Sequence, residues 1–279
     1  MAAAAVVALC STISYSAPAP IGKTIQASST VRASGAAGAR VLSTATPVYF
    51  MDALRSNATG VGQFEFVDGT KLAIGPNASI VIDKFVYKGG RTVQQLGIQA
   101  AKGAFRFISG QSPSAAYKVS TPYGTMGIRG TAFDFTVSGG RAYVVLLRGN
   151  VRYCSGRSCQ TLRRSCDFII ADGSTVSRPD HLAKVMDATQ ARQIFPHLAN
   201  QNRLASSFRQ PGRSCLSRVV RFQPDPVVPA AARALAAPEP GPAPAARQNR
   251  GFGNGPEGSE SEADGDNPGK GRGGPHRAD

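Results

Sequence analysis

The sequence predicts a mainly β protein with a small helical appendix and a disordered C-terminal tail. Three observations support this fold class. Short runs of alternating apolar and polar residues, separated by Gly, Asn and Asp turns, fill residues 48–172, which is typical of all-β domains. Helical signals follow at residues 187–210. Beyond residue 222 the chain consists largely of Pro, Ala, Gly, Ser and acidic residues.

Residues 1–16 are expected to form a secretory signal peptide. Ala2–Cys10 is a short apolar run followed by small residues, as in the apolar core and cleavage zone of such signals. Ser14 and Ser16 suit the two small positions before the cleaved bond, so Ala17 is the expected first residue after cleavage. This leader has no Lys or Arg, so a flexible apolar terminus of a cytosolic protein remains the alternative.

Residues 17–47 are interpreted as a lead-in strand region, and residues 48–178 as the β domain. Within this domain, the first hairpin is predicted to turn at residues 67–69. A three-residue loop pairs a phenylalanine with a leucine and a glutamate with a lysine, and it gathers the apolar side chains on one face. A two-residue turn would mix polar and apolar side chains on both faces. The favoured register gives the pairs Phe64–Leu72 and Glu65–Lys71.

A second hairpin is predicted to turn at Gly139-Gly140. A two-residue turn there places six apolar residues on one face of the two strands. The resulting pairs are Phe133–Leu146, Phe135–Val144 and Val137–Ala142.

Four cysteines remain if the leader with Cys10 is removed: Cys154, Cys159, Cys166 and Cys215. An even number in an exported chain predicts two disulfides. Four cysteines allow three pairings. A four-residue hairpin loop would place Cys154 opposite Cys159 and leave Cys166 for Cys215. The alternative, a structural zinc site, usually shows tighter paired spacing and nearby histidines.

Residues 179–222 are predicted to form a small helical appendix that depends on the Cys215 disulfide. Asp187 is a suitable helix cap, and Pro196 can begin a second helix that extends through Phe208. Residues 223–279 contain too few apolar side chains to offset the entropy cost of ordering, so the tail is expected to be disordered.

The net charge of +15 is distributed unevenly. Residues 1–222 carry +17 and the tail carries −2. Such a basic body attracts polyanions such as acidic polysaccharide, nucleic acid or anionic lipid, although solubility alone would also explain it. Nucleic acid is disfavoured as a partner, because the sequence shows no recognition helix, zinc finger or RNP-like aromatic strand.

Catalytic, cofactor and metal motifs are not evident. His181 and His197 flank the predicted helices, where each is expected to be an ordinary surface residue, and His276 lies in the tail. No nucleophile elbow, dinucleotide fingerprint or phosphate-binding loop accompanies them. After the leader, no run approaches the roughly 20 apolar residues that a membrane-spanning helix requires. The sequence therefore predicts a non-enzymatic protein without a cofactor, a metal site or a membrane-spanning helix in the mature chain.

The most distinctive segment lies at residues 119–137. Arg129 stands there among small and apolar residues, and we expect its guanidinium to be buried and held by a carboxylate such as Asp134 or Asp83. Contact with a ligand is the alternative role for Arg129. The residues that define this structural motif are Pro122, Gly127, Arg129, Gly130 and Thr131.

Residues 120–133 read S-T-P-x-x-x-x-G-I-R-G-T-x-F, which closely resembles the hallmark of FecR domains. Upstream motifs agree in order, and the resemblance covers residues 48–151, about a third of the chain. It implies a twisted antiparallel β-roll or sandwich of short hairpins. The upstream motifs are Phe66–Leu72, Gly75–Asp83, Phe85–Tyr87 and Gly103–Ser109.

The member that gives this family its name is a membrane-spanning regulator. It carries a signal from an outer-membrane iron transporter to a cytoplasmic sigma factor. The present sequence shows neither a membrane helix after the leader nor a cytoplasmic helical domain. The resemblance therefore extends to the domain and not to the signalling pathway from transporter to sigma factor. We expect an exported binding or sensor module, periplasmic or extracellular, whose partner is an envelope protein or a polyanionic polysaccharide. A structural matrix protein tethered to polyanionic cell-surface polysaccharide is the alternative.

Overall fold

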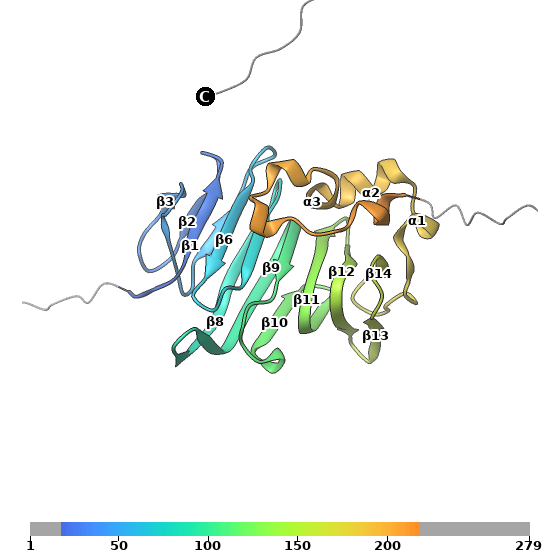
Figure 1. The fold of residues 1–279 in the computed structure, drawn as a ribbon, viewed down its shortest axis with the longest axis horizontal. Helices are drawn as coiled ribbons and strands as arrows, with labels where there is room; N and C mark the ends of the chain where they lie inside the picture. Colours follow the sequence, from blue (N-terminus) through green and yellow to red (C-terminus); the bar gives the residue numbers. More distant parts are fainter. Residues whose placement is uncertain (1–17, 218–279) are drawn as a thin grey trace, which may run out of the picture. The chain divides into compact units, whose positions relative to one another are not determined.

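The structure, a computed structural model, describes residues 18–217. Figure 1 shows a bent β-sheet with helices gathered along one end of its strands. The chain divides into the units Met1–Phe222 and Gln223–Asp279. The predicted signal peptide and the predicted disordered tail lie outside the described residues.

The described residues are mostly β-structure, as the sequence predicts. The strands are β1 (Pro20–Ala27), β2 (Arg32–Ser34), β3 (Arg40–Val41), β4 (Pro47–Tyr49), β5 (Ala53–Arg55), β6 (Gly62–Phe66), β7 (Lys71–Ile74), β8 (Ser79–Gly89), β9 (Thr92–Ile108), β10 (Tyr117–Thr121), β11 (Gly124–Ser138), β12 (Arg141–Ser155), β13 (Ser158–Leu162), β14 (Asp167–Ala171) and β15 (Asp180–His181). The helices are α1 (Leu182–Val185), α2 (Ala188–Ile194) and α3 (Pro196–Ala199), with the 3₁₀ turns η1 (Ser114–Ala116), η2 (Gln201–Arg203), η3 (Ser206–Phe208) and η4 (Arg213–Leu216).

All the strands belong to one hydrogen-bonded sheet. Its main path runs β15-β14-β12-β11-β10-β9-β7-β6-β1-β4. The expected lead-in contributes to this sheet, because β1 pairs with both β4 and β6. The pairing of β10 with β9 is parallel rather than antiparallel. After η1 the chain runs back beside the first half of β9, while the second half of β9 pairs with β11. The sheet is therefore mixed.

The structure confirms the predicted register of both hairpins. Phe64 pairs with Leu72 and Glu65 with Lys71. Gly69 has the positive φ of +80° that a bulged three-residue loop requires. The second hairpin has the predicted pairs, which are Phe133–Leu146, Phe135–Val144 and Val137–Ala142.

A bulge near the middle of β11 changes which residues face the core. Met126 and Ile128 point inward before it, and Phe133 and Phe135 point inward after it. The register shifts between Arg129 and Ala132. One extra residue in a strand reverses the alternation of faces, because side chains alternate with a period of two. The bulge therefore divides β11 into two halves. Even-numbered residues face the core in the first half, and odd-numbered residues face it in the second.

The main core lies on the inner face of the bent sheet, where its aromatic centre consists of Phe105, Phe107, Phe133 and Phe135. The helices cover part of the opposite, outer face, where a second apolar cluster forms. That cluster includes Ile108, Val145, Leu147, Phe168, Leu182, Phe195 and Leu198.

The helical appendix begins close to where the sequence indicates. Asp187 caps α2 by accepting hydrogen bonds from the backbone N–H groups of Thr189 and Gln190. Pro196 begins α3, but α3 ends at Ala199 rather than continuing through Phe208. Short 3₁₀ turns follow instead, and the contacts of Gln201 and of the Phe208 carbonyl with the sheet hold them there.

Candidate functional site

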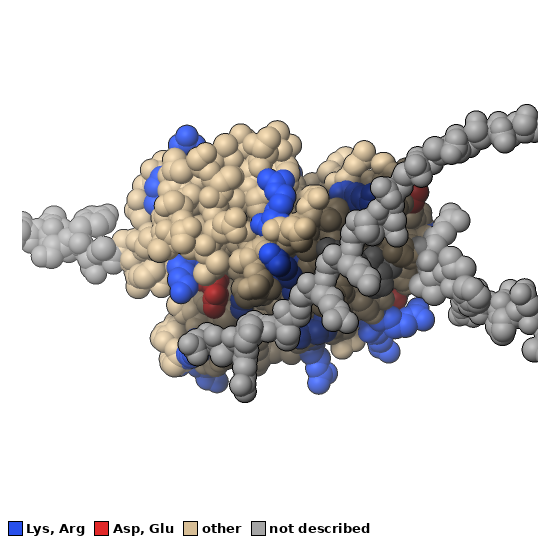
Figure 2. All heavy atoms as spheres, turned by 45° about the horizontal axis from the view of Figure 1, so that its top comes forward, with Lys and Arg blue, Asp and Glu red and all other residues tan. Residues whose placement is uncertain are grey.

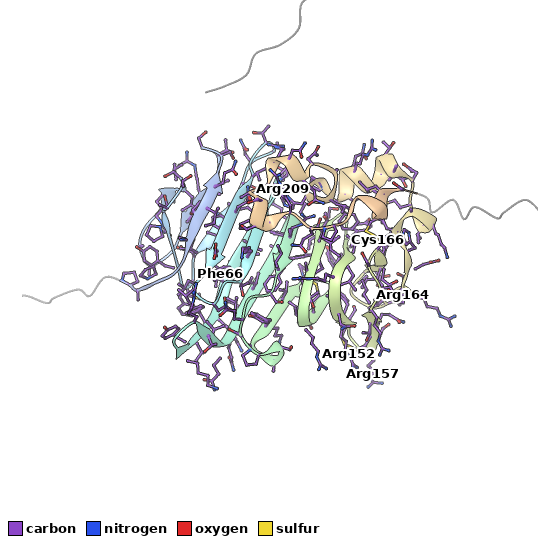
Figure 3. The ribbon with its side chains drawn as sticks, viewed as in Figure 1. Phe66, Arg152, Arg157, Arg164, Cys166 and Arg209 are labelled. Carbon is purple, nitrogen blue, oxygen red and sulfur yellow. A yellow bond between two sulfur atoms is a disulfide. The ribbon has the colours of Figure 1, made fainter. Side chains whose placement is uncertain are left out.

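The helices divide the outer face of the sheet into two parts. The covered half lies beneath them and consists of the outward residues of 104–108 in β9, 132–138 in β11 and 141–147 in β12. The bare half consists of the outward residues of 95–99 in β9, 117–121 in β10, 124–130 in β11 and 150–155 in β12. Figure 3 shows Arg209 beside the helices, whereas Arg152 and Arg157 lie at the opposite end of the strands.

A buried ion pair occupies the covered half. Arg106 and Asp134 are paired across β9 and β11, and their side chains are 0% and 2% exposed. Nε of Arg106 donates to Oδ1 of Asp134 at 2.6 Å, and an Nη donates to Oδ2 at 2.8 Å. This two-pronged geometry is the one that planar guanidinium and carboxylate groups favour.

The appendix completes the hydrogen bonding of Arg106. Its other Nη donates to Oε1 of Gln201 at 3.0 Å and to the Phe208 carbonyl at 3.2 Å. Gln201 in turn bonds the Gln210 backbone through both its oxygen and its nitrogen. A buried charge needs such additional partners, because attraction within the pair alone rarely offsets desolvation. The network therefore fixes the 3₁₀ turns onto the sheet.

His197 lies beside this network and is 4% exposed. Burial lowers the pKa of its imidazole to about 4, and the nearby Asp134 carboxylate only partly counteracts that shift. Nε2 of His197 has no hydrogen-bond partner among the described residues. His197 is therefore a neutral, buried residue of the interface between the appendix and the sheet, and the prediction that it lies at the surface is wrong.

The prediction for Arg129 is wrong. Its side chain is exposed, and its charged group forms no ion pair within residues 18–217. Asp134 does hold a buried arginine, but that arginine is Arg106. Arg129 lies before the bulge and Asp134 after it, so the two occupy different halves of β11.

The other motif residues form the turn and the bulge of the β10–β11 unit. Pro122 is exposed in the two-residue turn between those strands. Gly130 has φ +59° at the bulge. Thr131 is fully buried, and its hydroxyl donates to the Asn150 carbonyl at 2.7 Å. A side chain at Gly149 would meet the Gly130 carbonyl oxygen at 2.2 Å. The hallmark segment therefore stabilises the bulge at which the inward and outward positions of the strand are exchanged.

A second buried carboxylate holds the loop that the motif Phe66–Leu72 contains. Oδ2 of Asp68 accepts hydrogen bonds from the hydroxyls of Thr70, Ser112 and Tyr117 at 2.8–2.9 Å. Burial raises the pKa of the Tyr117 phenol, so the phenol remains a donor at neutral pH. The Asp68 cluster therefore joins the first hairpin to η1 and β10.

Both disulfides are present in the structure. Cys154 and Cys159 face each other across β12 and β13, with a Cα–Cα distance of 4.1 Å. The turn between these strands is shorter than predicted, because Ser155 and Ser158 also pair and leave only two residues in the loop. Cys166 bonds Cys215 over a separation of 49 residues, which attaches the end of the appendix to the sheet.

Burial of carboxylates makes the surface more basic than the sequence suggests. Residues 18–217 contain 24 Lys and Arg and nine Asp and Glu. Four of the nine acids are buried, whereas Arg106 is the only buried base among the described side chains. On the face shown in Figure 2, Lys and Arg visibly outnumber Asp and Glu. The buried acids are Asp52, Asp68, Asp134 and Asp167.

Two further searches cover the described residues only. No group of three or more His, Cys, Asp or Glu side chains within residues 18–217 is arranged to hold a metal ion. In the same range, no helix is long and apolar enough to cross a membrane.

Comparison with known proteins agrees with the motifs. A family model described as FecR protein matches residues 52–152. No curated protein matches the chain. Two crystal structures of a candidate anti-sigma factor from Parabacteroides distasonis are similar to it, with 14% and 18% identity and TM-scores of 0.38 and 0.34. Each comparison covers 45% of this chain and 57% of the other. The family match on its own identifies residues 52–152 as a FecR domain.

Proposed function

We propose that the protein is a non-catalytic binding or sensor module, exported to the cell envelope, that recognises a polyanionic partner. The observation that carries this proposal is the separation of charge described above. Nearly half of the described carboxylates are buried as hydrogen-bond acceptors, while the bases lie at the surface. A surface with this imbalance concentrates anionic polymers around it.

Two other features support the proposal. The disulfides favour export, because such bonds persist in oxidising compartments. Three of the buried titratable groups have structural positions: Asp68 holds a turn, Asp134 pairs with Arg106, and His197 lies in the appendix interface. Such placements favour a scaffold over a catalytic centre.

Retention of the full chain on an acidic polysaccharide tests the proposal, with a neutral polysaccharide as control. We expect binding at low salt to the acidic polymer alone, and release at about 1 M salt, where the screening length is only about 3 Å. Equal retention on both polymers, or none on either, would contradict the proposal.

The broad basic surface also supports a second candidate, a matrix protein tethered to cell-surface polysaccharide. Envelope extracts separate the two roles. One anionic partner retained in preference to the others supports the binding or sensor module, whereas salt-sensitive retention of many different anionic polymers supports the matrix role.

A further inference from the structure

We propose that the bare half of the sheet contains the binding site, and that Lys118, Arg129 and Arg152 bind a linear polysaccharide with widely spaced acidic groups. This inference rests on the proposed function and names its site and ligand class. The site spans the strands β10, β11 and β12, whose pairing fixes its geometry.

The three cations have fixed relative positions because their strands pair in register. Lys118 is opposite Gly127 on β11, and Gly127 is opposite Arg152 on β12. Neighbouring strands are spaced about 4.8 Å apart, so Lys118 and Arg152 lie about 9.5 Å apart at the backbone. Gly127 leaves the space between them open, since a Cβ there would meet only the Arg152 carbonyl, at 3.9 Å. Arg129 is the diagonal neighbour of Arg152 on the same face.

These cations have no counter-ion among the described residues. None of the three side chains forms an ion pair or a hydrogen bond there, and the one such bond of Arg129 is from its backbone N–H to the Thr131 hydroxyl. Asp83 lies beyond Gly97 on the β8 side, where its carboxylate accepts a hydrogen bond from Gln99 at 2.6 Å. Like charges at neighbouring positions of a sheet repel each other. A bound anion would remove that repulsion.

The surface between the cations is polar and suits sugar hydroxyls. The aromatic residues of these strands, such as Tyr117 and Tyr153, are buried on the inner side. The uncharged side chains that point outward supply amide and hydroxyl groups. They are Gln95, Gln99, Ser120, Thr125 and Asn150.

This chemistry favours a polysaccharide over nucleic acid. Proteins that bind single-stranded nucleic acid stack its bases on aromatic side chains, and the bare half turns its aromatic residues inward. Each strand of duplex DNA carries one phosphate for about every 3.4 Å of helix axis, which is a high linear charge density. A polymer with one carboxylate for every two sugars has the lower charge density that this spacing suits.

The first test compares two triple variants of equal charge, using hyaluronate as the probe. The site variant is Lys118→Gln/Arg129→Gln/Arg152→Gln. The control is Arg141→Gln/Arg178→Gln/Arg192→Gln, which removes three exposed cations elsewhere. We expect the site variant to bind hyaluronate at least about ten-fold more weakly than the control, since each lost contact weakens binding by a few-fold. Thermal unfolding checks that both variants are folded.

Two substitutions of Gly127 test the site more specifically, because the side chains that they introduce have almost the same shape and differ in charge. Gly127→Glu places a carboxylate between Lys118 and Arg152, and Gly127→Gln places a neutral amide there. We expect the glutamate variant to lose most of its hyaluronate binding and the glutamine variant to retain more. Equal binding by the two variants would contradict a charge-based site at this position.

The outcomes separate this inference from the proposed function. If the wild type binds hyaluronate and both triple variants lose the same amount of binding, the proposed site is wrong but the proposed function is retained. If the wild type binds no acidic polysaccharide, the proposed function fails as well. If single-stranded DNA binds more tightly than hyaluronate and only the site variant loses it, the location holds but the ligand class is overturned.

Discussion

The covered and bare halves of the outer face are built from the same strands, yet they place arginine in opposite environments. In the covered half, Arg106 is completely buried and has four hydrogen bonds to Asp134, Gln201 and the Phe208 carbonyl. In the bare half, Arg129 and Arg152 are exposed and their charged groups are unpaired within the described residues. Two features make this difference: β11 places Asp134 beside Arg106, and the appendix covers the pair and supplies two further acceptors. An outward-pointing arginine in a strand can therefore be part of the fold or part of a surface.

The largest loss of stability is expected for a substitution that disrupts the covered half. Asp134→Ala leaves the Arg106 guanidinium buried with only two neutral acceptors, and removing one member of a buried ion pair typically costs about 3–5 kcal/mol. Urea denaturation of the full chain measures this loss in the free energy of unfolding. A loss below about 1 kcal/mol would show that the pair is not essential to the covered half.

Removing a disulfide tests how far the appendix depends on its covalent attachment. Replacing Cys166 and Cys215 by alanine opens a loop of 49 residues, which should cost about 4 kcal/mol in the chain-entropy model. The same change at Cys154 and Cys159 opens a loop of five, and should cost only about 2 kcal/mol. Denaturation under non-reducing conditions gives the order, and the reverse order would contradict the entropic explanation.

Acid should weaken the covered half through His197. The unfolded imidazole binds a proton near pH 6.5, whereas in the folded protein burial lowers its pKa to about 4. The unfolded state therefore binds more protons in this window, and stability is lost as the pH falls from 6.5 to 4. The loss attributable to His197 is about 3 kcal/mol. His197→Gln should be less sensitive to pH in this window, and an unchanged pH profile would exclude this role.

The smallest effect is expected in the bare half. Arg129→Ala should change the free energy of unfolding by no more than about 0.5 kcal/mol, as for most exposed substitutions. Measured beside Asp134→Ala, it gives the contrast between the two halves of β11 directly. A loss comparable to that of Asp134→Ala would mean that Arg129 has a buried partner after all.

Local patterns in the sequence predict much of the sheet. The two hairpin registers follow from alternation of side chains with a period of two and from turn residues such as Gly69 and Gly139. The cap at Asp187 follows from local chemistry in the same way. These features depend on residues close together in the chain, so one sequence is enough to predict them.

The Arg106 network could not be predicted in this way, because its partners lie up to 102 residues away. A weaker signal was nevertheless present. The outward positions of the second hairpin include Val145 and Leu147, and apolar residues on both faces of a strand indicate that both faces are covered. Such a pattern predicts a covering layer, but it does not identify the residues that bind Arg106.

The long disulfide also determines how the molecule would carry a mechanical load. Tension applied through the chain beyond Leu216 would pass from Cys215 across the sulfur–sulfur bond to Cys166, which directly precedes β14. The helices between the two cysteines would bear almost none of it. Force on that end of the chain would thus reach the sheet directly, and the covered half would stay closed until the sheet itself yielded.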